Sequence, residues 1–492
     1  MFSRSLFFAI SLICLSVFSF VGFAQDEIDA LRYSFIVPQT TARSMGFGSA
    51  LGSVGADFGS LSVNPAGIGV YRSSDVMFTP SLKFNNVDAT YLNGLNNDQN
   101  TKFNFNNLGI VFTRAERGKR YEKSKWKTLA FGVGLNRLAD FNRNYFYTGL
   151  MKGQGNNYSS YSELYAVDAN AFGGQDNLGF AADIIYLGTN GFYYPVPNWE
   201  TGIIQSASVE ERGGINELVL SLGGNYQEKL MIGATLGLPS VRYNRESYFD
   251  EEDATNDTSN SFFYFRHNQS LAITGVGANL KLGIIYKPVD EFRVGVAIHT
   301  PTWFGLTETF NQNIVADMEL PSHPVQVIPF ESQYDYGIRT PWRAIVSATG
   351  FLGTYGFITA DYEYVDYTAM RLNLDNQAAN RERTVNTVIR RSFQGASNFR
   401  VGVEGRMDDF FGRVGVGYYG NPYKSKDMKM NRTDFSFGVG YRGAHFFADI
   451  AYVHATQNQY EAPYTLPDPV VVPKAKLENK FNTIALTFGW KM

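Results

Sequence analysis

The chain has 492 residues, of which 15 % are aromatic and only 18 % are charged, and it contains 48 glycines. Soluble domains usually carry about 25 % charged residues, so this composition disfavours an ordinary cytosolic enzyme. The aromatic content also excludes intrinsic disorder, because such a chain can bury ample apolar surface. The formal net charge of −3 offers no strongly basic face for nucleic acid.

Residues 1–24 have the pattern of an export signal. Arg4 provides a short positive region, a nearly unbroken apolar stretch follows, and small residues lead up to Ala24. We expect Sec-dependent export and cleavage before Gln25; a retained membrane anchor is the alternative, although it needs about 20 apolar residues. The single cysteine, Cys14, lies in this segment. The mature chain is therefore expected to have no disulfide, thiolate metal site or cysteine nucleophile.

From about residue 75 onward, apolar residues alternate with small or polar ones, which is the period of a strand whose two faces differ. The end of the chain is typical, with apolar Ile484, Leu486, Phe488 and Trp490 separated by single residues. Fourteen strands are predicted, near residues 75–88, 101–114, 126–141, 216–226, 230–247, 271–287, 292–310, 339–349, 355–371, 396–406, 412–424, 432–442, 445–457 and 479–492. Alternation alone does not separate a soluble β-sandwich from a membrane barrel.

The connections between these strands favour the barrel. Short joints such as 227–229 alternate with long polar loops, predicted at 142–215, 248–270, 311–338 and 372–395. Outer-membrane barrels have short periplasmic turns, long outer loops, an even strand number and aromatic residues near the strand ends. The sequence therefore predicts an all-β fold, a 14-stranded antiparallel transmembrane β-barrel over residues 75–492, in the bacterial outer membrane.

Residues 25–74 lack this alternation and carry three short motifs: ARSMGFGSA at 42–50, ADFGS at 56–60 and NPAG at 64–67. Their succession resembles the N-terminal hatch of the FadL-type family of outer-membrane transporters for long-chain fatty acids and aromatic hydrocarbons. The resemblance is strong over 42–70 and loose in the barrel. It implies that residues 25–74 form a hatch in the barrel lumen. The hatch or gating residues it implies are Gly46, Gly48, Asn64, Pro65 and Ala66.

The resemblance also implies an inward kink in the third barrel strand, near Gly132, Gly134 and Asn136. The Asn-Pro-Ala motif would meet this kink, and a lateral hole there would lead an apolar ligand into the bilayer. From the residues alone, residues 64–66 are equally well a turn into the first strand. The barrel glycines would either permit tight curvature or leave space for a plug.

Sites for other chemistry are not indicated. The five histidines are scattered without metal-ligand spacing, and there is no Gly-x-Ser-x-Gly motif. A lipase built from Ser and His on neighbouring strands is a minor alternative. The acidic run 250–253, placed in an outer loop, is interpreted as a solvated loop in preference to a cation site. We expect no enzyme activity, no cofactor and no metal.

The predicted function is passive, diffusion-driven uptake of hydrophobic small molecules such as long-chain fatty acids. The long loop 142–215 offers a candidate ligand groove at Tyr165, Phe172, Phe180 and Tyr186, although these side chains could equally pack a small core within the loop. The partners expected are outer-membrane lipid and an apolar ligand, with no nucleic acid. A monomer is compatible with the sequence, but the oligomeric state is left open. The alternative function, also implied by the resemblance, is a docking barrel that holds a secreted cargo protein in a type IX secretion pathway.

Overall fold

The computed structural model describes residues 27–174, 177–255, 261–319, 326–374 and 379–492, so the predicted signal peptide lies outside the described residues. The strands are β1 Asp75–Tyr91, β2 Gly94–Ala115, β3 Trp126–Asp140, β4 Arg143–Met151, β5 Ile185–Leu187, β6 Tyr193–Pro195, β7 Ile203–Tyr226, β8 Leu230–Asp253, β9 Tyr264–Val289, β10 Phe292–His299, β11 Trp303–Asp317, β12 Gln326–Arg339, β13 Arg343–Phe351, β14 Gly356–Asp366, β15 Arg371–Asn373, β16 Gly395–Met407, β17 Phe410–Tyr419, β18 Arg432–Arg442, β19 Phe446–Glu461 and β20 Ala475–Lys491. The helical segments are α2 Glu27–Arg32, α3 Ala42–Gly46, α4 Ser60–Val63, η1 Pro65–Val70, α5 Lys119–Lys123, α6 Tyr161–Phe172, α7 Leu178–Ala181, η2 Tyr367–Ala369 and α8 Ala379–Ser392. None of the described helices is both long and apolar enough to cross a membrane.

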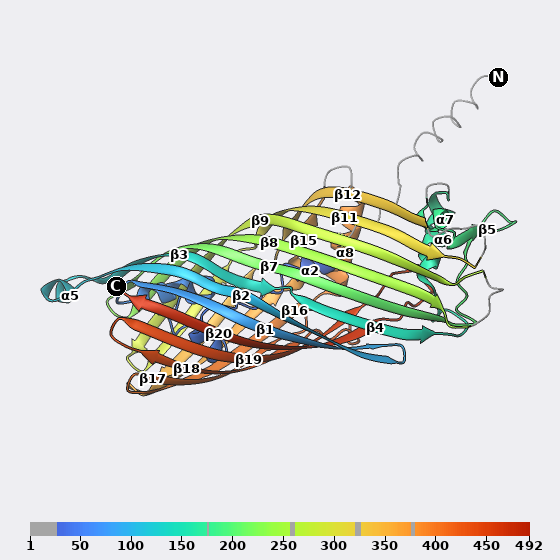
Figure 1. The fold of residues 1–492 in the computed structure, drawn as a ribbon. Helices are drawn as coiled ribbons and strands as arrows, with labels where there is room; N and C mark the ends of the chain where they lie inside the picture. Colours follow the sequence, from blue (N-terminus) through green and yellow to red (C-terminus); the bar gives the residue numbers. More distant parts are fainter. Residues whose placement is uncertain (1–26, 175–176, 256–260, 320–325, 375–378) are drawn as a thin grey trace, which may run out of the picture.

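The strands form one antiparallel sheet of 18 segments that closes into a barrel, because β1 pairs with β20 (Figure 1). Only β5 and β6 stand apart, as a separate two-stranded sheet among the described residues. Four wall strands are each built from two segments: β3 with β4, β10 with β11, β12 with β13, and β14 with β15. The wall therefore has 14 strands, which confirms the predicted count and fold class.

The wall is apolar outside and polar inside. In β17, for example, Phe410, Val414 and Val416 are exposed, whereas Arg413 between them is buried. Exposed aromatic side chains gather beside the short connections, and we call this set the aromatic girdle: Trp126, Tyr286, Phe292, Tyr355, Phe410, Tyr441 and Trp490. Short turns mark the periplasmic end of such barrels, so the girdle marks the periplasmic border of the bilayer. This architecture places the protein in the bacterial outer membrane.

The strands continue well past the bilayer at the other end, where the sequence predicts loops. β8 and β9 have 24 and 26 residues, whereas about 9–11 residues cross a bilayer. The predicted loop 142–215 is wrong at both ends, because β4 occupies 143–151 and β7 begins at 203. The acidic run 250–253 also belongs to β8. Beyond the bilayer the outward side chains are polar, as at Arg242 and Glu246, so the apolar alternation that identifies a membrane strand fades.

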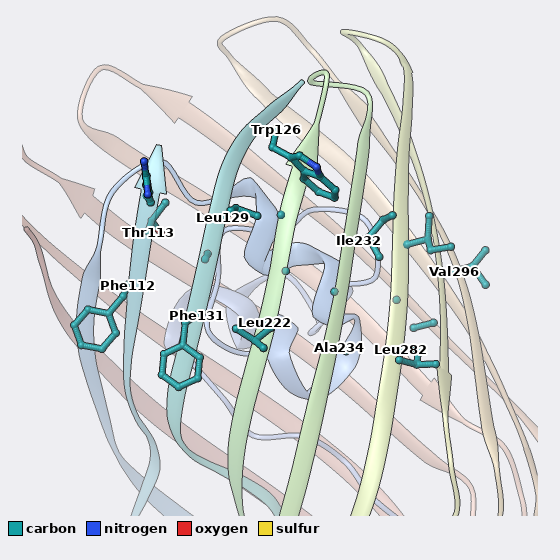
Figure 2. Close-up of a pocket in the computed structure, with 18 of the residues that line it drawn as sticks. Phe112, Thr113, Trp126, Leu129, Phe131, Leu222, Ile232, Ala234, Leu282 and Val296 are labelled. Atoms are coloured by element: carbon teal, nitrogen blue, oxygen red, sulfur yellow. The ribbon is translucent and has the colours of Figure 1, made fainter. Parts of the chain in front are cut away.

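Residues 27–74 lie inside the barrel, and their helical segments are visible behind the wall strands in Figure 2. Inward-facing glycines make room for them. A Cβ on Gly233 of β8 would lie 2.2 Å from the Pro65 carbonyl oxygen, and one on Gly415 of β17 would lie 2.2 Å from the Gly48 nitrogen. Non-bonded carbon contacts are optimal near 3.5–4.0 Å. The backbone of the N-terminal segment therefore occupies the space that wall side chains would need.

Candidate functional site

The first two predicted gating residues, Gly46 and Gly48, lie where the hatch meets β17 and β18. The Gly46 carbonyl oxygen accepts a hydrogen bond from Ser436 Oγ at 3.2 Å. Gly48 has a φ of 73°, a conformation that residues with a side chain rarely adopt. The hatch is thus seated backbone to backbone on this part of the wall.

The Asn64-Pro65-Ala66 motif lies at a different part of the wall, against β8 and β9. Asn64 is fully buried, and its Oδ1 accepts from the Ala66 N–H at 3.1 Å while its Nδ2 donates to the Gly52 carbonyl oxygen at 2.6 Å. A Cβ on Gly283 of β9 would lie 1.9 Å from Asn64 Oδ1. The motif is therefore a turn that ties two parts of the hatch to each other and to the wall. Its hydrogen bonds do not reach the third wall strand, which is where the family resemblance had placed it.

The third wall strand, β3 with β4, is interrupted close to the predicted kink. The β2–β3 ladder is regular up to the pair Asn107–Asn136 and ends there. The four residues from Asn136 to Ala139 are all buried, so the inside–outside alternation of a straight strand is lost. The register with β7 shifts between Arg137 and Ala139 as well. The strand therefore turns inward after Asn136.

Only one of the three predicted kink residues stands at this break. Gly132 and Gly134 lie within the regular part of the ladder. A Cβ on Gly132 would contact Leu61 of the hatch at 2.7 Å, and one on Gly134 would contact the Leu108 carbonyl oxygen of β2 at 2.3 Å. These glycines allow close packing, and the kink itself follows them in the chain.

Beyond the break, β2 and the third wall strand are joined by side chains. Three asparagines of β2 reach across: Asn96 accepts from the Thr148 N–H at 3.1 Å, Asn100 donates to Asn144 at 2.7 Å, and Asn104 donates to Asp140 at 2.9 Å. In the part of the chain that the structure describes, residues 94–106 of β2 have ladder pairing only with β1. We call this line of contacts the side-chain seam. Opening it would break fewer backbone hydrogen bonds than opening any regular ladder.

Asp140 closes the inner side of the seam. Its buried carboxylate accepts from Lys83 Nζ at 2.9 Å, from Arg137 Nη2 at 2.7 Å and from Asn142 Nδ2 at 3.1 Å. Buried charges are stable only when they are paired and hydrogen-bonded, and loss of one partner costs about 3–5 kcal/mol. This polar cluster seals the break against the lumen.

The hatch contacts two asparagines that border the seam. Asn136 Nδ2 donates to Ser62 Oγ at 2.9 Å, so the last rung of the ladder is tied to the hatch. β2 bulges at Asn106, next to the position where Pro80 of β1 supplies no N–H. The Asn106 amide lies 3.5 Å from the Met45 sulfur of the hatch. Movement of the hatch would therefore act on residues that adjoin the seam.

Several charged side chains that face the lumen pair with one another or with the hatch. Arg400 binds Glu363 at 2.8 Å, and Arg413 binds Glu404 at 2.6 Å. Arg293 donates to the Val54 carbonyl oxygen of the hatch at 2.7 Å. Other such contacts are Lys281 with Glu217, Arg43 with Glu404, and the Gly52 N–H with Asp361. The lumen around the hatch is consequently polar and filled.

Within the hatch, the carboxyl group of Asp57 is buried. Removal of this carboxyl group from water raises its pKa, and this effect outweighs the nearby Arg43 and the hydrogen bonds from Thr41 at 2.9 and 2.8 Å. Among the described residues, no group of three or more His, Cys, Asp or Glu is arranged to hold a metal ion.

The outer mouth is covered by α6. Its N-terminus is held by Glu251 of β8, which accepts hydrogen bonds from Ser160 Oγ, from the Tyr161 N–H at 2.7 Å and from Gln205 Nε2 at 2.7 Å. The Tyr161 ring packs 5.3 Å from that of Phe249. Inward-facing residues of many strands join this cluster, so α6 covers this end of the barrel as a lid.

The four predicted groove residues do not share one environment. Tyr165 is buried in the lid cluster, and Phe180 is half-buried beside it, with its ring 5.4 Å from Tyr193. Phe172 and Tyr186 are about half exposed, at 50 % and 52 %. For Tyr165 the arrangement corresponds to the alternative interpretation, in which the loop packs a core.

Sequence reasoning missed the seam, although a signal was present. Residues 93–107 contain seven asparagines, a residue type depleted in strands. A strand with so many short amides indicates that side chains take over hydrogen bonding from the backbone. No sequence pattern indicates the Asp140 cluster, because one of its cationic partners, Lys83, lies on a different strand, β1.

Comparison with known proteins bears on the fold. Neither the protein-family models nor the curated proteins match this chain. The crystal structure of a Pseudomonas aeruginosa FadL homologue matches with a TM-score of 0.55 at 12 % identity, covering 93 % of this chain and 99 % of that chain. The Ralstonia pickettii toluene transporter TbuX matches with a TM-score of 0.52 at 15 % identity, covering 92 % and 98 %, and the Pseudomonas putida toluene transporter TodX with 0.52 at 12 %, covering 92 % and 99 %.

At these identities the likeness defines the fold. The chain has the FadL-type outer-membrane barrel, as the motifs at 42–67 predict. None of the three matched proteins is described as an enzyme, which agrees with the sequence prediction.

Proposed function

We propose that this protein carries hydrophobic small molecules, such as long-chain fatty acids, passively across the outer membrane and releases them sideways through the side-chain seam. The observation that carries the proposal is the end of the backbone ladder at Asn107–Asn136. On the lipid side the seam is flanked by exposed apolar side chains, Phe103, Phe105 and Leu135. The descriptions of TbuX and TodX as toluene transporters support an apolar ligand.

In the proposed cycle, the lid and the hatch close the barrel at rest. Displacement of α6 admits the ligand, which gains about 25 cal/mol for each Å² of apolar surface removed from water. Hatch movement then withdraws Ser62 from Asn136 and Met45 from Asn106, and the Asp140 cluster separates. Transport runs down the ligand gradient and needs no nucleotide.

A disulfide across the seam tests this route. Asn100→Cys with Asn144→Cys replaces two amides that lie 2.7 Å apart, and the only natural cysteine is Cys14 of the predicted signal peptide. We expect oxidised protein in lipid vesicles to lose acceleration of labelled fatty acid uptake and to regain it on reduction. The matched control is Phe112→Cys with Phe131→Cys, a pair in the regular β2–β3 ladder, where oxidation should change nothing.

Equal uptake by the oxidised and reduced seam variants would exclude the seam as the route. A wild-type protein that never accelerates uptake over protein-free vesicles, yet retains a secreted protein by its C-terminal domain, would favour the docking function in a type IX pathway.

A further inference from the structure

An apolar groove runs along the outer surface of the barrel near its periplasmic end. It has a volume of about 980 Å³ and extends from β2 across β3, β7, β8 and β9 to β10. Figure 2 shows large side chains standing around it, including Phe131, Leu222, Ile232 and Leu282. The groove therefore faces the bilayer, on the side of the wall opposite to the hatch.

Small outward residues form the floor of this groove. Ala234 of β8 lies directly between Leu222 of β7 and Leu282 of β9 in the sheet register. Gly224 of β7 also lies between Leu129 of β3 and Ile232 of β8, and the Leu129 and Trp126 side chains lean over it, 2.9 and 3.1 Å from where its Cβ would be. The short Ala234 side chain therefore leaves a low position between two leucine side chains on this part of the wall.

The periplasmic end of the groove is basic. Arg114 of β2 lines the groove, lies opposite Leu129 in the ladder, and its side chain is 76 % exposed. Its contact with Glu116 is long, at 3.9 Å. Residues 114–127 contain seven basic and two acidic side chains, a net charge of +5 in a protein whose total charge is −3. The hairpin that carries α5 extends this charge beyond the end of the barrel (Figure 1).

The level of the groove in the membrane is given by Trp126, a member of the aromatic girdle that also lines it. Girdle side chains lie at the height of the lipid headgroups. An acyl chain in the groove would thus extend from a headgroup beside Arg114 towards the middle of the bilayer. An anionic headgroup would gain from the hairpin charge, since attraction between charges acts over about 8–10 Å at physiological salt.

We propose that this groove with its basic end is a binding site for an anionic phospholipid of the inner leaflet of the outer membrane. The charge of the hairpin selects the headgroup, and the groove over Ala234 holds one acyl chain. This site is independent of the proposed transport function, because it lies outside the lumen and away from the seam.

The test measures lipid association with the full-length barrel in phosphatidylcholine bilayers, using spin-labelled phosphatidylglycerol and spin-labelled phosphatidylcholine as probes. We expect the barrel to prefer phosphatidylglycerol, and high salt to reduce the preference. Arg114→Gln should lower association of phosphatidylglycerol about fivefold and leave phosphatidylcholine unchanged, the effect of about one basic side chain near a membrane surface. Ala234→Phe should fill the groove and lower association of phosphatidylglycerol with the charge intact.

Two variants serve as matched controls. Arg406→Gln removes an exposed arginine at the same end of the barrel, on β16, and Gly412→Phe adds a ring at an exposed glycine of β17 whose Cβ position has no neighbour within 4 Å. Both should keep the preference. Equal affinity of the wild type for the two lipids, or equal losses in Arg114→Gln and Arg406→Gln, would overturn the proposal. Binding of an acidic peptide to the hairpin with no lipid preference would also overturn it and indicate a protein partner.

Discussion

Gly415→Ala tests how the hatch is held in the barrel. The new Cβ would lie 2.2 Å from the Gly48 nitrogen and 2.3 Å from the Phe47 carbonyl carbon, and both are backbone atoms that cannot rotate away. Gly48 is itself fixed in a left-handed conformation with φ 73°. One added methyl group must therefore displace the hatch by more than an ångström or strain β17.

The expected magnitude follows from core packing. Overpacking of a well-filled interior costs about 1–3 kcal/mol. Because about 1.4 kcal/mol is a tenfold change in an equilibrium constant, the population with the hatch unseated should rise about 5- to 150-fold. Barrel formation should persist, because the wall ladder on both sides of Gly415 is unchanged.

The assay uses a cysteine as a reporter of hatch exposure. Ser53 is fully buried in the hatch, with its Oγ 2.7 Å from Thr349 Oγ1, so Ser53→Cys is a conservative buried probe. The rate of maleimide labelling reports the unseated population when seating is fast. The control is Gly412→Ala on the same strand, where a Cβ meets nothing within 4 Å. If Gly415→Ala and Gly412→Ala label at the same rate while both barrels remain folded, the seating argument fails.

Three further changes probe other contacts. Lys281→Met should destabilise the barrel by about 3–5 kcal/mol, because it leaves Glu217 buried without its cation; Lys281→Met combined with Glu217→Leu should recover most of the loss in denaturant unfolding. At the periplasmic turn, burial opposes ionisation of Glu228, but hydrogen bonds from Arg72 and neighbouring groups outweigh it and lower its pKa below the usual 4.5. The contribution of ionised Glu228 to stability is therefore complete above about pH 5 and is lost as the pH falls through the lowered pKa. Cleavage of the α5 hairpin by short protease pulses, measured relative to an unstructured substrate, should therefore rise in acid for the wild type. In Glu228→Gln the cleavage should show no such change with pH. Glu251→Gln replaces an acceptor-only carboxylate with an amide that also points N–H groups at the donors at the N-terminus of α6. This should weaken docking of the α6 lid by about 1–3 kcal/mol. Cleavage of the lid by an external protease should become faster, and cleavage of the α5 hairpin should not change.

Several features could be predicted because they depend on local pattern. Alternation along each strand and the alternation of short and long connections predicted the 14-stranded barrel. The hatch motifs could be recognised because Gly48 and Asn64 occupy positions with strict backbone demands, a left-handed residue and a capped turn. The outer limits of the strands could not be found this way. Beyond the bilayer the outward side chains are polar, so apolar and polar residues no longer alternate along the strand.

The sequence by itself therefore determined the class of fold and the number of wall strands. Only the tertiary structure decided which residues meet across the lumen: Asn64 against β9, Asn136 with Ser62, and Asp140 between Lys83 and Arg137. The physical reason is that strand period fixes the face of each residue, whereas its height and neighbours depend on the stagger of fourteen strands around the closed barrel, which no single strand encodes.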